Sequence, residues 1–294
     1  MKKRRGTGTA GAAAAIGSSA KGTKDAFGLE PGTSFVRATR LAAVLVVVCT
    51  LAEVVTPTAY GRFASSAAQI SLDPRIGWWL LELPCTISFC YFFFGDKHPN
   101  AAGTRAPAAR VLGAIFVMHY MYRGWIFPAL IRVHNGAKSF SPVTALGGWI
   151  VTILHGFLSA RWFGRHGPHL RKEGGSLKAL LKPHALLGLF MYYSGLAMIV
   201  WHDSLLRSLR YPGAPRYSIP RGGLFDYATS AQYFCELWAW TGFAILSWGP
   251  NGLFILLVSV GNLVPRAART HDWYLKKFGE EYPASRARLV PFVW

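Results

Sequence analysis

The chain has 294 residues, of which 52% are hydrophobic and only 15% are charged, and its mean hydropathy is +0.26. Its 32 Lys and Arg residues against 13 Asp and Glu residues give a formal net charge of +19. This balance excludes an acidic disordered protein, and four Cys in a chain of this length exclude a disulfide scaffold. A basic soluble protein that binds nucleic acid would interleave apolar with polar residues. Here the apolar residues cluster in long blocks, so no nucleic-acid partner is expected.

The first 37 residues differ in composition from the rest of the chain. Lys, Arg, Gly, Ala, Ser and Thr dominate them, and no apolar face repeats with helical spacing. Such a composition is typical of disordered segments. We therefore expect a disordered basic tail at 1–37 and one membrane domain at 38–294.

Seven apolar blocks follow the tail, most of them close to the roughly 20 residues that a helix needs to cross a bilayer. They fall at residues 41–57, 76–95, 111–131, 142–160, 179–201, 228–248 and 251–265. The sequence thus predicts an all-α multi-span membrane protein with seven transmembrane helices and cytosolic loops that close over a ligand site. Lys and Arg divide almost evenly between the two sides of such a bundle, so charge alone leaves its orientation open.

The cysteines and histidines of the apolar blocks predict no metal site. The cysteines lack the spacing of zinc ligands. Three histidines in or beside the blocks lack the paired histidine or carboxylate partners that a metal would need: His119, His155 and His184. We interpret each of these three as a hydrogen-bonded interior histidine.

Ionisable groups inside apolar blocks carry the functional prediction, because burying one in a bilayer costs on the order of 3 kcal/mol or more unless it is paired or neutralised. Glu82, Arg123 and Glu236 occupy such positions. For Glu82 the structural alternative is a carboxyl that satisfies backbone groups freed by Pro84, and a structural role is also open for Glu236. Glu53 sits near the end of its block, where it can reach the membrane interface.

Tyr120 lies three residues before Arg123 and therefore on the same helical face. The cation favours a polarised phenol hydroxyl, and Glu82, withdrawn from water, can stay protonated near neutral pH and act as a second donor. Two such donors suit the carbonyl oxygen of an apolar ligand, because negative charge grows on that oxygen when a conjugated double bond accepts hydride. The spacing does not show whether Glu82 and Tyr120 meet, and Tyr120 can equally be a core tyrosine.

A second polar concentration covers residues 203–226 and the C-terminal tail. Arg207 and Arg210 share one helical face, and Pro212 with Gly213 predicts a turn directly after them. Arginines in this setting can bind phosphate groups through paired hydrogen bonds. Anionic lipid head groups at the membrane surface are the alternative partner.

Two long motifs show a resemblance to a known family. One runs from HDSLLRSLR through PG and IP to GGLF (202–225), and the other runs from HDWYLKKF through YP and SR to VPF (271–292). LLELP at 80–84 and HYMYR at 119–123 match weaker motifs in the same order. From about Tyr60 to Trp294 the chain resembles the steroid 5α-reductases. The resemblance implies a seven-helix enzyme of the endoplasmic-reticulum membrane that takes hydride from NADPH and saturates a carbon–carbon double bond, commonly one conjugated to a steroid 3-ketone.

The resemblance also implies roles for individual residues. Glu82 falls on the family's substrate-binding glutamate and Tyr120 on its catalytic tyrosine, so both should face the carbonyl oxygen. The positions implied for the NADPH site are Arg123, Asp203, Arg210, Tyr217, Gln232, Glu236, Arg266 and Tyr274, with Arg132 and Lys138 in a basic loop. The C-terminal tail is then expected on the cytosolic side, where NADPH is available.

The sequence departs from the family pattern at three positions. Gln232 and Ile199 stand where asparagines that contact the cofactor are expected, and His155 replaces a glutamine near the substrate. These departures, with a long basic loop at 159–183, leave the small apolar substrate open among a 3-oxo-Δ4-steroid, a polyprenol and a trans-2-enoyl-CoA thioester. A non-catalytic sterol- or lipid-binding membrane protein, with membrane lipids as its partners, is the alternative from a different class.

Overall fold

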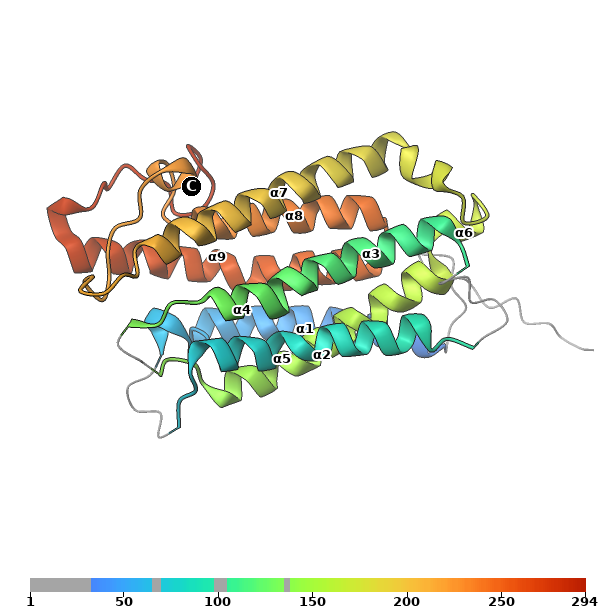
Figure 1. Ribbon diagram of the computed structural model, residues 1–294, viewed down its shortest axis with the longest axis horizontal. Helices are drawn as coiled ribbons and strands as arrows, with labels where there is room; N and C mark the ends of the chain where they lie inside the picture. Colours follow the sequence, from blue (N-terminus) through green and yellow to red (C-terminus); the bar gives the residue numbers. More distant parts are fainter. Residues whose placement is uncertain (1–32, 65–69, 98–104, 135–137) are drawn as a thin grey trace, which may run out of the picture.

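The computed structural model of the protein describes residues 33–64, 70–97, 105–134 and 138–294. Long α-helices form most of this part of the chain, which contains no β-sheet. The helices lie side by side along one axis (Figure 1). The predicted all-α class is therefore confirmed, while residues 1–32 of the predicted tail lie outside the described residues.

The first two helices begin at residues that can cap them. Helix α1 (Ser34–Val55) follows Thr33, whose Oγ1 accepts a hydrogen bond from the Val36 backbone N–H at 3.2 Å. Because this cap satisfies a free N–H at the helix start, α1 begins before the predicted apolar block and takes in the last residues assigned to the tail. Helix α2 (Pro74–Phe94) begins after Asp73, which caps the backbone N–H of Arg75 at 2.8 Å.

Two of the middle helices continue through a π-helical turn. Helix α3 (Pro107–Met121) passes through the π-helical turn Tyr122–Ile126 into the short α4 (Phe127–Leu130). Helix α5 (Pro142–Arg161) passes through a second such turn, Trp162–His166, before α6 (Pro168–Arg171). A π-helical turn widens the helix locally and is common at functional sites. The first of these turns contains Arg123.

The last three helices pack closely at positions where one helix presents a glycine to its neighbour. Helix α7 (Pro183–Ser208) and α8 (Ala231–Ser247) are adjacent, and α9 (Pro250–Phe278) follows α8 after a short corner. A Cβ atom on Gly195 would lie 2.7 Å from the Ala239 backbone nitrogen. Small residues of this kind let the backbones of membrane helices approach each other.

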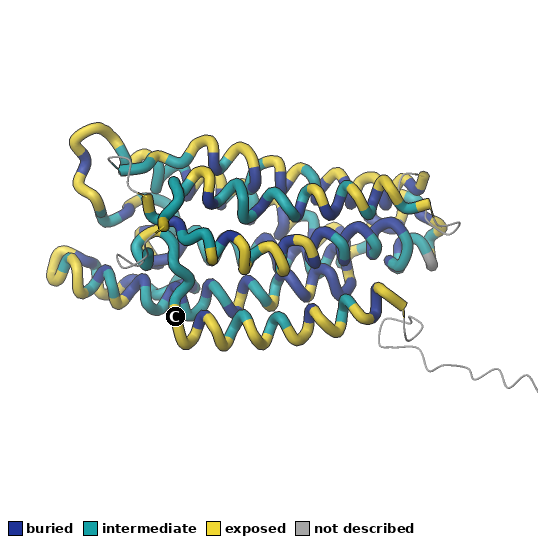
Figure 2. The backbone as a smooth tube through the Cα atoms, turned by 90° about the horizontal axis from the view of Figure 1, so that it is seen from below, coloured by how far each residue is buried: buried dark blue, intermediate teal, exposed yellow. Residues whose placement is uncertain are grey.

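All seven predicted apolar blocks fall on helices, with shifted ends. Five helical segments of the described chain are long and apolar enough to cross a membrane: 34–55, 74–94, 142–170, 183–208 and 250–281. Helices α3 and α8, with 15 and 17 residues, are shorter. Large apolar side chains such as Val55, Val143 and Phe190 are exposed, and exposed positions follow the outer sides of the helices (Figure 2). The chain is thus a multi-pass membrane protein, with five of the seven predicted spans supported by length and composition.

One end of the bundle gathers the segments that shape the candidate site. Residues 209–230 and 279–294 lie beside the end of α9 at the same end as the C-terminus (Figure 1). At this end the segment around Tyr60 pairs with the segment before α5, since Gly61 donates to the Ser139 carbonyl at 3.0 Å and Leu72 to the Phe140 carbonyl at 2.8 Å. These contacts fix Tyr60 and Phe140 beside the start of α2.

Candidate active site

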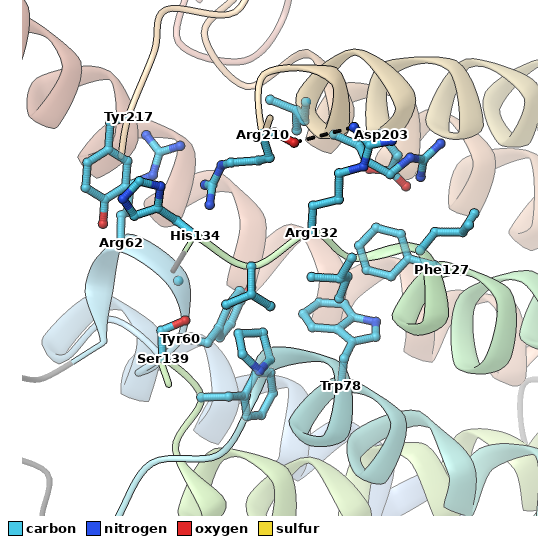
Figure 3. A pocket seen from close by; sticks show the side chains of 18 of the residues that line it. Tyr60, Arg62, Trp78, Phe127, Arg132, His134, Ser139, Asp203, Arg210 and Tyr217 are labelled. Atoms are coloured by element: carbon cyan, nitrogen blue, oxygen red, sulfur yellow. Dashed lines mark hydrogen bonds between the residues drawn. The ribbon is translucent and has the colours of Figure 1, made fainter. Parts of the chain in front are cut away.

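A basic cavity of about 320 Å³ lies at this loop-covered end of the bundle (Figure 3). We call it the outer cavity. Its walls combine aromatic rings with six arginines: Arg62, Arg132, Arg207, Arg210, Arg216 and Arg266. Arg132 donates from Nη1 to the carbonyl of Arg210 at 3.4 Å, which links the segment after α4 to the segment after α7. The concentration of guanidinium groups makes this cavity suited to an anionic ligand.

A second cavity of about 400 Å³ lies deeper, between α1, α2, α3, α5, α8 and α9. We call it the inner cavity. Most of its lining is apolar, but Glu82, His119, Tyr120, Arg123 and Glu236 also line it. Tyr60, Trp78 and Phe140 line both cavities. The two cavities therefore adjoin across this three-residue wall, so ligands in them would lie next to each other.

Arg123 is paired with two carboxylates inside the bundle. Its Nε lies 3.4 Å from Glu82 Oε1, and its Nη2 lies 3.5 Å from Glu236 Oε2. Its guanidinium carbon stands 4.4 Å from the centre of the Trp78 ring. Pairing of this kind offsets the desolvation of a buried guanidinium. Three charges that the sequence placed in separate apolar blocks thus form one network.

Tyr120 and Glu82 line the same cavity. Tyr120 is buried, and its ring packs against Phe116 with 4.8 Å between centroids. Glu82 is buried in α2, and a Cβ atom on Gly124 would lie 3.4 Å from its Cβ. The close passage of the π-helical turn against α2 thus brings the two predicted donors to one apolar space.

The donors of Arg266 are occupied by the protein itself. This fully buried guanidinium donates to the carbonyls of Thr58 and Tyr60, each at 3.0 Å, and to the Tyr233 hydroxyl at 3.2 Å. Its guanidinium carbon lies 3.7 Å from the centre of the Tyr60 ring. Arg266 therefore holds the Tyr60 segment against α9 at the lining of the outer cavity.

Glu53, which its position near a block end led us to expect at the membrane interface, turns inward and pairs with α9. It is buried, and its Oε2 accepts a hydrogen bond from the Thr58 backbone N–H at 2.8 Å. Its Oε1 lies 3.3 Å from Nη1 of Arg269. The carboxylate turns inward because its cationic partner, far away in the sequence, lies on the adjacent α9.

The other residues predicted for the cofactor divide into two groups. Asp203, Arg210 and Tyr217 line the outer cavity, and Asp203 Oδ2 accepts from the Tyr122 hydroxyl at 3.1 Å. Three others line neither cavity: Lys138 is exposed, Gln232 lies in the first turn of α8, and Tyr274 is buried in α9. Ile199 is likewise buried in α7.

Sequence reasoning did not single out Tyr60 and Arg62. Arg62 donates from Nη2 to the Tyr274 hydroxyl at 3.3 Å, and its Nη1 has no hydrogen-bond partner within the described residues. Enclosure by its neighbours raises the pKa of the Tyr60 phenol, with the nearby Arg266 charge acting in the opposite direction, so this phenol stays protonated at neutral pH. The signal in the sequence is a Tyr-Gly-Arg stretch directly after the first apolar block.

The fold and the two cavities define a multi-pass helical membrane protein in which a basic cavity at one end adjoins an apolar cavity inside the bundle. Residues 139–294 match the family model described as 3-oxo-5-alpha-steroid 4-dehydrogenase. The chain belongs to this family, and the resemblance seen in its motifs is confirmed.

The curated relatives that the chain resembles come from animals and plants. It is 36% identical over 236 residues to 3-oxo-5-alpha-steroid 4-dehydrogenase 1 of Mus musculus, covering 80% of this chain and 88% of the relative. It is 32% identical over 237 residues to steroid 5-alpha-reductase DET2 of Solanum lycopersicum, covering 80% and 87%. It is 31% identical over 239 residues to 3-oxo-5-alpha-steroid 4-dehydrogenase 1 of Homo sapiens, covering 81% and 87%.

Proposed function

We propose that this protein uses NADPH to reduce the carbon–carbon double bond of a 3-oxo-Δ4-steroid or a similar lipid enone. One observation carries the proposal: an apolar cavity lined by Glu82 and Tyr120 adjoins a basic cavity across a shared wall. Hydride transfer needs a donor and an acceptor side by side. The names of the animal and plant relatives support a steroid as the acceptor.

The residues of the outer cavity fit a phosphate-bearing dinucleotide. The unpaired Nη1 of Arg62 is a buried donor without a partner among the described residues, and Arg210 and Arg216 line the same cavity. Phosphate oxygens are strong acceptors for such donors. Asp203 and Tyr217 also line this cavity. Lys138 is exposed and precedes the lining residue Ser139, so it would contribute at most from outside the cavity. When bound, NADPH would supply the hydride.

Glu82 and Tyr120 would stabilise the charge that develops on the substrate. As the β-carbon gains hydride, negative charge moves to the carbonyl oxygen, and the Tyr120 hydroxyl would donate a hydrogen bond to that oxygen, joined by Glu82 once this carboxylate has taken up a proton in the closed site. A proton added to the α-carbon then completes the reduction. Arg123 would keep Glu82 in place, and the apolar walls would exclude water from the enolate.

We further propose two additional spans: one formed by α3 together with α4, and one formed by α8. The protein then has seven transmembrane helices in one domain, preceded by the basic tail. The 17 residues of α8 rise about 25 Å, close to the hydrocarbon thickness of a bilayer. A site that uses NADPH needs its outer cavity on the cytosolic side. The C-terminus lies at that end of the bundle (Figure 1), so we place it in the cytosol and the protein in the endoplasmic-reticulum membrane.

A substrate panel tests this function. Membranes that contain the protein are incubated with NADPH or NADH and with a 3-oxo-Δ4-steroid, a polyprenol or a trans-2-enoyl-CoA, and both cofactor consumption and products are measured. We expect consumption of NADPH with the steroid and a product saturated at the conjugated double bond. Turnover with only the polyprenol or the thioester would assign the chain a different substrate within its family. NADPH binding without turnover of any substrate would contradict the proposed reaction.

A further inference from the structure

His155 lies buried in the inner cavity without a hydrogen bond. Its exposed fraction is 0%, and neither ring nitrogen has a partner within the described part of the chain. No group among the described residues supplies the hydrogen bond expected for this interior histidine. A buried polar group without a partner lowers the stability of the folded protein, so the presence of a histidine at this position needs an explanation.

The surroundings of His155 offer it few polar partners. Its ring packs among aromatic rings, with centroid distances of 5.1 Å to Phe116, 5.8 Å to Trp240 and 6.0 Å to Phe243. The phenol ring of Tyr120 lies at 5.9 Å. Tyr120 and Trp240 are thus the polar side chains that the ring contacts bring to His155, and all three residues line the inner cavity.

Other unpaired polar atoms surround the same tyrosine. His119, whose Nδ1 has no partner among the described residues, stands 5.3 Å from the Tyr120 ring. The buried Tyr192, whose hydroxyl is likewise unpaired, stands 5.8 Å from His119. Ordered water is the usual partner of buried polar atoms that the protein itself leaves unsatisfied.

We propose that His155, acting through an enclosed water, positions the hydroxyl of Tyr120. A neutral imidazole can donate one hydrogen bond to this water and accept another, and the water can then donate to the phenol oxygen. A phenol oxygen that accepts from the water keeps its own O–H free for the carbonyl oxygen of the substrate. This assignment rests on the proposed enone reduction and makes His155 a positioning residue, since Tyr120 alone touches the substrate.

Two substitutions at His155 separate positioning from packing. His155→Leu removes both nitrogens, whereas His155→Gln keeps one donor and one acceptor. We expect His155→Leu to lower kcat by about tenfold or more with the KM for NADPH unchanged, and His155→Gln to retain at least about a third of the wild-type kcat. In a Tyr120→Phe background His155→Leu should have no further effect, because the hydroxyl that it positions is absent.

Thermal stability provides a readout that does not depend on turnover. His169 is a buried histidine outside both cavities whose Nε2 is 2.9 Å from the carbonyl oxygen of Phe163. We expect His169→Leu to lower the melting temperature of the purified protein, because it leaves this carbonyl unpaired, and to leave kcat unchanged. His155→Leu should lower the melting temperature less than His169→Leu, because the two nitrogens that it removes have no hydrogen-bond partner in the protein itself.

Three outcomes would overturn the positioning role: a wild-type kcat in His155→Leu, an equal loss of kcat in the presence and absence of the Tyr120 hydroxyl, or a fall in melting temperature that matches His169→Leu. A wild-type enzyme that reduces no enone would instead contradict the proposed function, and the inference would fall with it. Wild-type turnover combined with any of the three outcomes contradicts the inference alone.

Discussion

The Nε atom of Arg123 lies 3.4 Å from Oε1 of Glu82, which joins the π-helical turn after α3 to the middle of α2. Glu236 on α8 approaches the same guanidinium at 3.5 Å. One cation therefore ties three helices together beside the wall between the two cavities. The position of Glu82 in the inner cavity depends on this ion pair.

Arg123→Met should destabilise the protein more than Glu82→Gln. Loss of the guanidinium leaves two buried carboxylates without their cation, which costs about 3–5 kcal/mol, whereas Glu82→Gln leaves Arg123 paired with Glu236. Unfolding of the purified protein in detergent measures both. Arg75→Met, which breaks an exposed pair with Asp73, serves as the control and should change little. Recovery of stability in the triple variant Arg123→Met, Glu82→Gln, Glu236→Gln would support the ionic origin of the loss, and equal losses in Arg123→Met and Arg75→Met would contradict it.

Tyr120→Phe should lower kcat by roughly 10²-fold or more while the dissociation constant of NADPH stays unchanged. Removal of one preorganised donor to a developing oxyanion typically costs this much, and the phenyl ring preserves the packing against Phe116. Steady-state kinetics with the steroid enone and an NADPH titration give the two numbers. Turnover at the wild-type rate would remove Tyr120 from the proposed chemistry.

Arg62→Ala should raise the KM for NADPH by roughly tenfold or more with little effect on kcat. A hydrogen bond between ionised partners contributes about 1.5–3 kcal/mol, and the free Nη1 of Arg62 is available for one. Arg75→Ala at the same end of the bundle is the matched control, because Arg75 pairs with Asp73 and lines neither cavity. An unchanged KM in Arg62→Ala would show that phosphate binding depends on other arginines.

The sequence alone predicted the helices and singled out Glu82, Arg123 and Glu236 as ionisable groups inside apolar blocks. Both predictions follow from the cost of polar groups in a bilayer: apolar blocks must be helical to satisfy their backbones, and charges within them must find partners. Because the blocks contain few other charges, Arg123 has few possible partners besides Glu82 and Glu236. The structure shows that Arg123 pairs with both of them.

Features that depend on contacts between distant segments were not predicted. Glu53 turns inward because Arg269 lies beside it in space, although 216 residues separate them in sequence. Tyr60 belongs to the wall between the cavities because the segment before α5 folds against it, and no local pattern records that contact. The unpaired state of His155 likewise depends on which rings the neighbouring helices place around it.

Arg266→Ala should lower both the stability of the protein and its affinity for NADPH. The substitution removes the guanidinium hydrogen bonds to the carbonyls of Thr58 and Tyr60, which then keep only the backbone donors of Tyr60 and Phe63, and it releases the Tyr60 segment, whose Tyr60 lines both cavities. Arg266→Lys should not restore either property, because an ammonium group lacks the planar fork that spans two carbonyls. Thermal unfolding and an NADPH titration test this. A variant with lower affinity and unchanged stability would instead indicate a direct phosphate contact.

Gly77→Ala should disturb the wall between the two cavities and with it both binding and turnover. A Cβ atom at this position of α2 would lie 2.3 Å from Cγ of Phe140, so the Phe140 ring must move. Phe140 packs against Tyr60 and Trp78, with ring centroids at 5.7 Å and 6.0 Å, and therefore transmits the displacement to the whole wall. We expect a lower melting temperature and a reduced kcat/KM for the enone. Gly147→Ala in α5 is the stability control, because a Cβ there meets nothing within 4 Å and should gain about 1 kcal/mol of helix propensity. Equal melting temperatures for the two variants would mean that Phe140 accommodates the methyl group without moving the wall.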